Sequence, residues 1–168
     1  GTYSYASTSR AAAEVLKMDW SNCDVITGRT DRHLPITSPQ DGSNSIFTNT
    51  RTCYGAAQDM LAKMKEIAAG DLGGDVADYD IDGSRVFQIA DNSVGMTYAE
   101  VATRGLALGG KYTGEAELPE ELNVLTQLSV ERLAGSALMG VYHDPRHNNN
   151  PPGFTVTFTE IELDKETG

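Results

Sequence analysis

One long helical stretch, from about Asn44 to Ala69, constrains the fold more than any other part of the sequence. Its apolar positions recur at helical spacing and comprise Ala56, Met60, Ala62, Met64 and Ile67. Gly70 follows and is expected to end the helix, because glycine is common just past a helix C-terminus. The chain has 168 residues, of which 39% are apolar. This length and composition fit a single domain, residues 1–168, with a real hydrophobic core.

Further helices and strands are expected on both sides of this helix. Residues 3–18 read as a helix and residues 23–28 as a short strand, followed by a polar loop up to about residue 45. Residues 77–89 read as a β-hairpin, because Asp82-Gly83 separates two β-like runs.

Signals in the C-terminal half favour one more helix and two strands. Thr97 and Glu100 form a capping box for a helix that reaches about Leu108, where Gly109-Gly110 ends it. Strands are expected over residues 111–117 and 153–163, the second with a bulge near Thr159-Glu160. The expected class is therefore α+β, with a mixed sheet and several packed helices.

Charge and cysteine content exclude several classes of protein. Thirteen basic and 24 acidic residues give a net charge of −11, which would repel nucleic acid. No apolar run reaches the roughly 18 residues that span a bilayer, and no secretory signal opens the chain. Cys23 and Cys53 are too few for a disulfide scaffold, so a reduced, cytoplasmic protein is expected.

Three motifs imitate binding sites. Residues 78–84 resemble the first half of a calcium loop, but Ile89 stands where a bidentate glutamate is required, so a hairpin is favoured. His143 and His147 have a zinc-like spacing, but the prolines around them forbid a regular helix, which favours a surface loop. Residues 70–75 lack the lysine of a phosphate loop and are read as a linker. No metal ligand is therefore assigned.

Several segments, taken in order, resemble the molybdenum hydroxylase family of xanthine dehydrogenases and aldehyde oxidases. The chain opens Gly1-Thr2 and continues to Ala12-Ala13-Glu14-Val15-Leu16, similar to the family's GQG-(T)…AAeeLG stretch. Residues 25–31 (VITGRTD) resemble the strand that ends in GDTD, and residues 39–44 (PQDGSN) resemble the P-x-G-G-S-R loop. Residues 158–164 (FTEIELD) and 166–168 (ETG) resemble F-a-E-V-x-V-D-x-x-T-G.

The resemblance implies that residues 1–168 are an internal fragment of a molybdopterin-cofactor-binding subunit, with the fold of one half of that domain. The parent would hydroxylate N-heterocycles, aldehydes or aromatic acyl thioesters, with water as oxygen donor. Its cofactor would be molybdopterin with molybdenum, free or as the cytosine dinucleotide. The implied partners are iron–sulfur and FAD domains or subunits, the remainder of the molybdopterin subunit and a small-molecule substrate.

The resemblance also places the cofactor contacts. The family's P-x-G-G-S-R loop maps onto Gly42, Ser43 and Asn44, and Gly1 and Thr2 would belong to a second contact loop. Glycine permits close backbone approach, serine offers a hydroxyl, and the start of the following helix offers unpaired N–H groups. No catalytic residue is assigned, because the family's catalytic glutamate lies in a later glycine-rich segment. This chain alone is therefore not expected to turn over substrate.

Three departures from the family pattern favour an alternative function. Asp41 stands in place of a glycine, where its charge would repel a pyrophosphate. Thr50 replaces a helix glycine, and Arg29 replaces the acidic residue of GDTD. The alternative is a non-catalytic α+β binding or assembly module that retains the fold without the cofactor.

Overall fold

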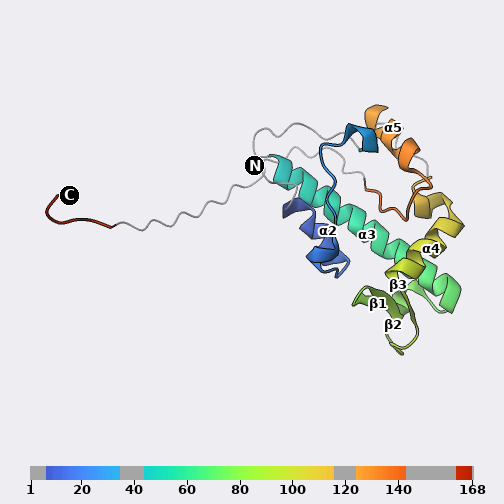
Figure 1. Cartoon of the computed structure of the whole chain (residues 1–168). Helices are drawn as coiled ribbons and strands as arrows, with labels where there is room; N and C mark the ends of the chain where they lie inside the picture. Colours follow the sequence, from blue (N-terminus) through green and yellow to red (C-terminus); the bar gives the residue numbers. More distant parts are fainter. Residues whose placement is uncertain (1–6, 35–43, 116–123, 143–161, 168) are drawn as a thin grey trace.

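The computed structural model describes residues 7–34, 44–115, 124–142 and 162–167. Helix α3 (Asn44–Leu72) runs through the middle of the molecule, and α2 (Arg10–Val15) packs along it. A small sheet of β1 (Tyr79–Asp82), β2 (Arg85–Gln88) and β3 (Gly95–Thr97) lies at the C-terminal end of α3, next to α4 (Tyr98–Leu108) (Figure 1). Helix α5 (Val124–Leu133) follows the 3₁₀ turn η4 (Gly110–Thr113).

Helix α3 confirms the central prediction from the sequence. It begins at Asn44, as expected, but continues past Gly70 to Leu72. Gly73 and Gly74 end it instead, with φ of +85° and +86°. The Gly73 carbonyl then accepts a hydrogen bond of 2.6 Å from the Tyr79 hydroxyl. The helix therefore stops where two consecutive glycines adopt the left-handed region, and not at the first glycine in the sequence.

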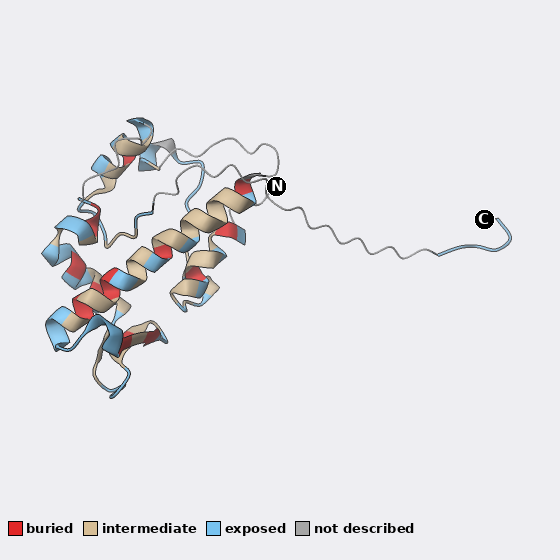
Figure 2. Ribbon diagram, turned by 180° about the vertical axis from the view of Figure 1, so that it is seen from behind, coloured by how far each residue is buried: buried red, intermediate tan, exposed pale blue. Residues whose placement is uncertain are grey.

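The hydrophobic core lies between the C-terminal half of α3, the sheet and α4 (Figure 2). Met64 and Ile67 of α3 were expected in it and are buried, whereas Ala62, also expected there, is exposed. The buried cluster consists of Met64, Ile67, Ala68, Tyr79, Ile81, Val86 and Val101. These residues come from four elements, so the core depends on the docking of the hairpin and α4 onto α3.

The hairpin is confirmed, with its turn one residue later than expected. Asp82 pairs with Arg85, so Gly83 and Ser84 form the two-residue turn, both with positive φ (52° and 60°). This is the primed geometry that matches strand twist. Strand β3, which the sequence did not predict, pairs antiparallel with β2. Gly95 makes that pairing possible, because a Cβ there would collide with the backbone of Val86.

Helix α4 begins at the predicted capping box. The Thr97 hydroxyl accepts from the Glu100 N–H at 3.2 Å, and Glu100 accepts from the Thr97 N–H at 2.7 Å. We expect Thr97→Ala to lower the free energy of unfolding by about 1 kcal/mol, because it leaves a first-turn N–H without its acceptor. Urea denaturation of Thr97→Ala and Thr97→Ser would check this, since serine keeps the cap; equal losses in both would contradict it.

The other half of the capping box makes stability depend on pH. Hydrogen bonds from the Thr97 N–H and hydroxyl lower the pKa of Glu100. A carboxyl group with a lowered pKa stabilises the fold above its ordinary pKa, and this contribution is lost as the pH falls through the lowered value. Glu100→Ala should therefore reduce the melting temperature at pH 7 and have a smaller effect at pH 3. An equal effect at both pH values would argue against this role.

Three further predicted boundaries or elements are wrong. The first helix ends at Val15, and not at residue 18, because Lys17 adopts φ 46°. The Met18 N–H then bonds to the Ala13 carbonyl and the Lys17 N–H to the Glu14 carbonyl, a Schellman motif built without glycine.

Two of the predicted strands do not form. Residues 23–28 are in no helix or strand of the described chain, Gly28 has a positive φ of 64°, and Ile26 is exposed. Residues 110–113 form the turn η4 in place of the start of a strand over 111–117. A strand needs a partner edge for its backbone groups, and the described chain offers none at either place. The strand predicted for residues 153–163 lies almost wholly outside the described residues; Glu162 and Leu163 are not in a strand.

The α+β class expected from the sequence is confirmed. Among the described residues it comprises four α-helices and a three-stranded sheet, which is antiparallel where a mixed sheet was expected. Within the same part of the chain, no helix is both long and apolar enough to cross a membrane.

Candidate functional site

One residue of the predicted cofactor corner, Asn44, lies at the start of α3. Asn44 is the first residue of that helix, while Gly1, Thr2, Gly42 and Ser43 lie outside the described residues. The first N–H groups of a helix have no partner within the helix, and the helix dipole places partial positive charge there. The helix therefore begins at Asn44, as the sequence predicted, and the role of Asn44 in binding a cofactor stays a prediction.

The first half of α3 lacks acidic side chains. Its first turn carries no acidic side chain, and the stretch from Asn44 to Gln58 contains one basic residue, Arg51, and no acidic one. This is notable in a chain with a net charge of −11. The chemistry of the helix start thus fits an anionic cofactor.

Two of the three departures from the family pattern, Arg29 and Thr50, lie within the described residues. The Arg29 guanidinium donates two hydrogen bonds to the carboxylate of Asp31, at 2.8 and 2.7 Å. This interaction lowers the pKa of Asp31. Thr50 lies half-buried on α3, and Asp41 lies outside the described residues. Arg29 therefore neutralises the neighbouring carboxylate in its own loop.

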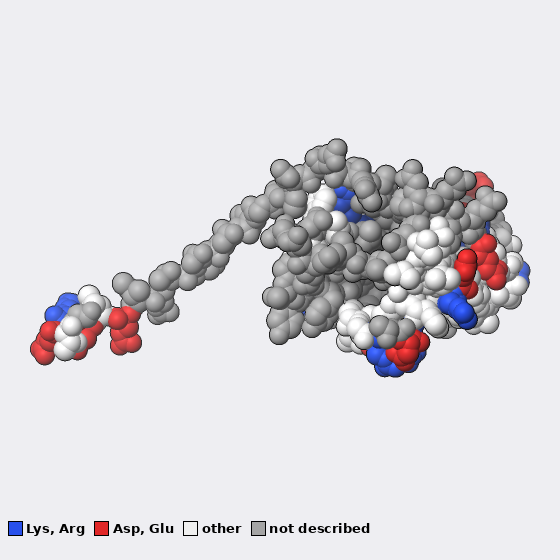
Figure 3. Space-filling model, turned by 90° about the horizontal axis from the view of Figure 1, so that it is seen from above, with Lys and Arg blue, Asp and Glu red and all other residues white. Residues whose placement is uncertain are grey.

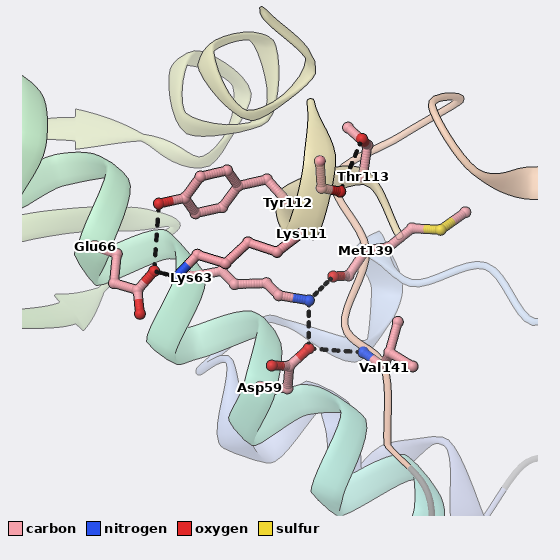
Figure 4. Close-up of polar contacts among 9 residues, drawn as sticks. Asp59, Lys63, Glu66, Lys111, Tyr112, Thr113, Met139 and Val141 are labelled. Carbon is pink, nitrogen blue, oxygen red and sulfur yellow. Dashed lines mark hydrogen bonds and ion pairs between the residues drawn. The ribbon is translucent and has the colours of Figure 1, made fainter. Parts of the chain in front are cut away.

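A second feature of α3 is a segment that crosses it, residues 139–142, here named the strap. Asp59 accepts a hydrogen bond from the Val141 N–H at 2.8 Å and from Lys63 Nζ at 2.6 Å (Figure 4). Lys63 Nζ also donates to the Met139 carbonyl at 2.9 Å. The Lys63 side chain is 9% exposed and that of Asp59 34% exposed. An ion pair within α3 thus fixes the backbone of the strap on both sides of Gly140.

Two glycines permit this close approach. A Cβ on Gly140 would collide with the Ala56 carbonyl oxygen of α3, and a Cβ on Gly55 would collide with the ring of Tyr142. The strap therefore lies directly against the helix backbone, with the Tyr142 ring over Gly55. Sequence reasoning missed this arrangement, because the glycines are far apart in the chain and neither belongs to a recognised motif.

A cavity of about 580 Å³ opens between α3 and the strap. Its lining is mostly apolar and consists of Arg51, Tyr54, Gly55, Gln58, Asp59, Val141 and Tyr142. Arg51 also lies over the ring of Phe47, 5.2 Å from its centre. The cavity is open to solvent over much of its surface.

About two turns beyond Asp59 on α3, a second carboxylate holds η4. Glu66 accepts from Lys111 Nζ at 2.6 Å and from the Tyr112 hydroxyl at 3.3 Å (Figure 4). The hydrogen bond to Glu66 raises the pKa of Lys111. Elsewhere on the surface, acidic and basic side chains of the described residues lie next to one another (Figure 3). The chain's negative charge is thus partly compensated locally.

Where the remaining candidate sites fall within the described residues, they give no functional group. Asp80 lies in the calcium-like run, on the hairpin, and accepts a hydrogen bond from the Ile81 N–H. Its carboxylate also forms ion pairs with Lys17 and Lys65. His143 and His147 lie outside the described residues, which contain no cluster of His, Cys, Asp and Glu suited to a metal. Burial raises the pKa of the Cys53 thiol, consistent with a structural cysteine.

Comparison with known proteins identifies the family. No curated protein and no solved structure matches the chain. The family model described as "Molybdopterin cofactor-binding domain" matches residues 1–168, the whole chain. This agrees with the α+β fold of the described residues. The chain therefore belongs to the molybdopterin cofactor-binding domain family, as found in molybdenum hydroxylases.

Proposed function

We propose that this chain holds molybdopterin for a hydroxylase that acts on N-heterocycles, aldehydes or aromatic acyl thioesters, with water as the oxygen donor. The observation that carries the proposal is the match of all 168 residues to the cofactor-binding family. The start of α3 supports it, because the helix begins at Asn44 and carries no acidic residue in its first turn.

In this proposal the residues of the chain bind and orient the cofactor. The Gly42, Ser43 and Asn44 amides and the Ser43 hydroxyl donate hydrogen bonds to its phosphate oxygens, and Gly1 and Thr2 contribute from a second loop. When bound, the cofactor supplies the redox-active metal at which the substrate is oxidised. Iron–sulfur and FAD domains or subunits of the complete protein would carry the electrons away.

The proposal predicts the cofactor content of the full-length protein that carries this chain. Purified from a host with a working cofactor pathway, it should contain molybdenum and molybdopterin in similar molar amounts, approaching one of each per chain. Elemental analysis and quantification of the released pterin would check this. Metal-free and pterin-free protein from such a host would reject the proposal in favour of a non-catalytic binding or assembly module.

The substrate class needs a separate test. The holoprotein should oxidise a panel of aromatic N-heterocycles, aldehydes or acyl thioesters with an artificial electron acceptor, and ¹⁸O from labelled water should appear in the product. Turnover with the label derived from O₂ would overturn the hydroxylase assignment and leave cofactor binding intact.

A further inference from the structure

The turn of the β1–β2 hairpin places an aspartate directly before a glycine at the surface. Asp82 is the last residue of β1, and Gly83 is the first of the two turn residues, with φ 52°. Both residues are exposed, and a Cβ built on Gly83 would meet no atom within 4 Å. The turn takes no part in the proposed cofactor contacts, so its chemistry is independent of cofactor binding.

The two groups that could react with each other are not held by other groups. Among the described residues, the Asp82 carboxylate makes no hydrogen bond or ion pair, and the Gly83 N–H has no acceptor. The turn is closed by the pairing of Asp82 with Arg85, which does not use the Gly83 N–H. The Asp82 carboxyl carbon is therefore free to turn towards the amide nitrogen of Gly83.

Asp80, two residues earlier on the same strand, is the opposite case. Its carboxylate accepts the Ile81 N–H at 2.8 Å and lies 3.5 Å from Lys17 Nζ and 3.8 Å from Lys65 Nζ. The hydrogen bond from Ile81, followed by the two lysines, lowers the pKa of Asp80, so its protonated form is rare. Ile81 is also buried and branched at Cβ, which crowds its amide nitrogen. The hairpin thus carries one restrained and one unrestrained aspartate.

We propose that Asp82 is a site of spontaneous modification, where aspartate isomerises to isoaspartate through a succinimide. The Gly83 nitrogen forms a bond to Asp82 Cγ and loses its hydrogen, while one oxygen of the protonated carboxyl group leaves as water. Water then opens the five-membered ring. Attack at Cγ restores aspartate, and attack at the main-chain carbonyl carbon leaves the chain connected through Cγ. Water is the only co-reactant, and nothing is oxidised or reduced.

The modification changes the backbone at the residue that closes the turn. Isoaspartate inserts one additional carbon into the main chain at Asp82, which pairs with Arg85. The register of this hairpin places Tyr79, Ile81 and Val86 in the hydrophobic core. Because the strand register determines which side chains face the core, the isomerised protein should be less stable than the unmodified protein.

The test incubates the folded full-length protein in ¹⁸O-labelled water at neutral pH and locates the label by mass spectrometry. Each passage through the succinimide exchanges one carboxyl oxygen of that aspartate with solvent. Trypsin releases residues 66–85 as one peptide, which contains both Asp80 and Asp82. Fragmentation of this peptide should show exchange at Asp82 at least about tenfold faster than at Asp80, or a barrier lower by about 1.4 kcal/mol. It should also show the fragment ions specific to isoaspartate at position 82.

The control is Asp82→Glu, which keeps the charge but would have to form a six-membered ring. It should remain folded by circular dichroism and show almost no exchange at position 82. The other Asp-Gly pair, Asp41-Gly42, falls in a different tryptic peptide and is counted separately. The proposal is overturned if wild-type Asp82 exchanges no faster than Asp80, or if exchange at Asp82 yields no isoaspartate. Exchange in Asp82→Glu at the wild-type rate would also overturn it.

Discussion

Replacement of Ile67 by alanine is expected to lower the free energy of unfolding by about 3 kcal/mol. Ile67 is 2% exposed and lies in the cluster that joins α3 to the hairpin and α4. Its Cδ1 also lies 3.3 Å from where a Cβ on Gly105 would be, so α4 approaches α3 closely at this point. The substitution removes transfer free energy and leaves a cavity between elements that cannot easily collapse onto it.

The control for this prediction is the same substitution at Ile89, which is 63% exposed on the hairpin. Ile89→Ala should change stability by less than about 0.5 kcal/mol. Urea denaturation of both variants would measure the difference. A loss below about 1 kcal/mol for Ile67→Ala would show that the α3–α4–hairpin core is not the stabilising centre of the fold.

Replacement of Lys63 by methionine is expected to cost about 2 kcal/mol. Methionine keeps the apolar stem but removes the ammonium group, so the Met139 carbonyl and one oxygen of Asp59 lose their charged donor. A fully buried pair would lose roughly 3–5 kcal/mol. We expect less because the Asp59 side chain is 34% exposed and keeps the Val141 N–H.

Lys65 is the matched control, on the same helix two residues away. It contacts Asp80 at 3.8 Å, and that carboxylate is nearly half exposed. Lys65→Met should therefore cost less than about 0.5 kcal/mol. A double-mutant cycle of Lys63→Met with Asp59→Asn would isolate the coupling energy, and a value near zero would show that the pair does not hold the strap.

The elements that the sequence predicted correctly carry local signals. Helix α3 has a sustained helical pattern, the Gly83 turn a hairpin dipeptide, and Thr97 with Glu100 a capping box. Each of these depends on residues within a few positions of one another, so no tertiary information is needed to find it.

The elements that were missed depend on distant partners. Residues 23–28 have β-like composition, but a strand forms only when another edge is available. Lys17 ends α2 with a positive φ, a conformation that usually requires glycine. The Tyr98 hydroxyl donates a hydrogen bond of 2.6 Å to the carbonyl of the neighbouring Leu16. Burial and the nearby Asp82 and Asp80 raise the pKa of Tyr98 to about 12, so this bond persists over the ordinary pH range.

Part of the candidate site could be read from the sequence and part could not. The start of α3 at Asn44 was predicted, and the cofactor contacts assigned to Gly42, Ser43 and Asn44 stay a prediction. The strap and its cavity required the structure, because Gly55 and Gly140 meet only after folding. The spacing of Asp59 and Lys63 predicts an ion pair within a helix, but not that Lys63 also binds a carbonyl in a distant segment.

Cofactor retention by a Gly42→Val variant of the full-length protein tests the binding corner most directly. A branched side chain there would keep phosphate oxygens away from the backbone N–H groups. We predict at least about a tenfold fall in the molar ratio of molybdopterin to protein, or about 1.4 kcal/mol of binding free energy. Gly70→Val, at an exposed helical glycine with open space around it, should retain the wild-type ratio. A folded Gly42→Val protein with the wild-type ratio would contradict the assignment.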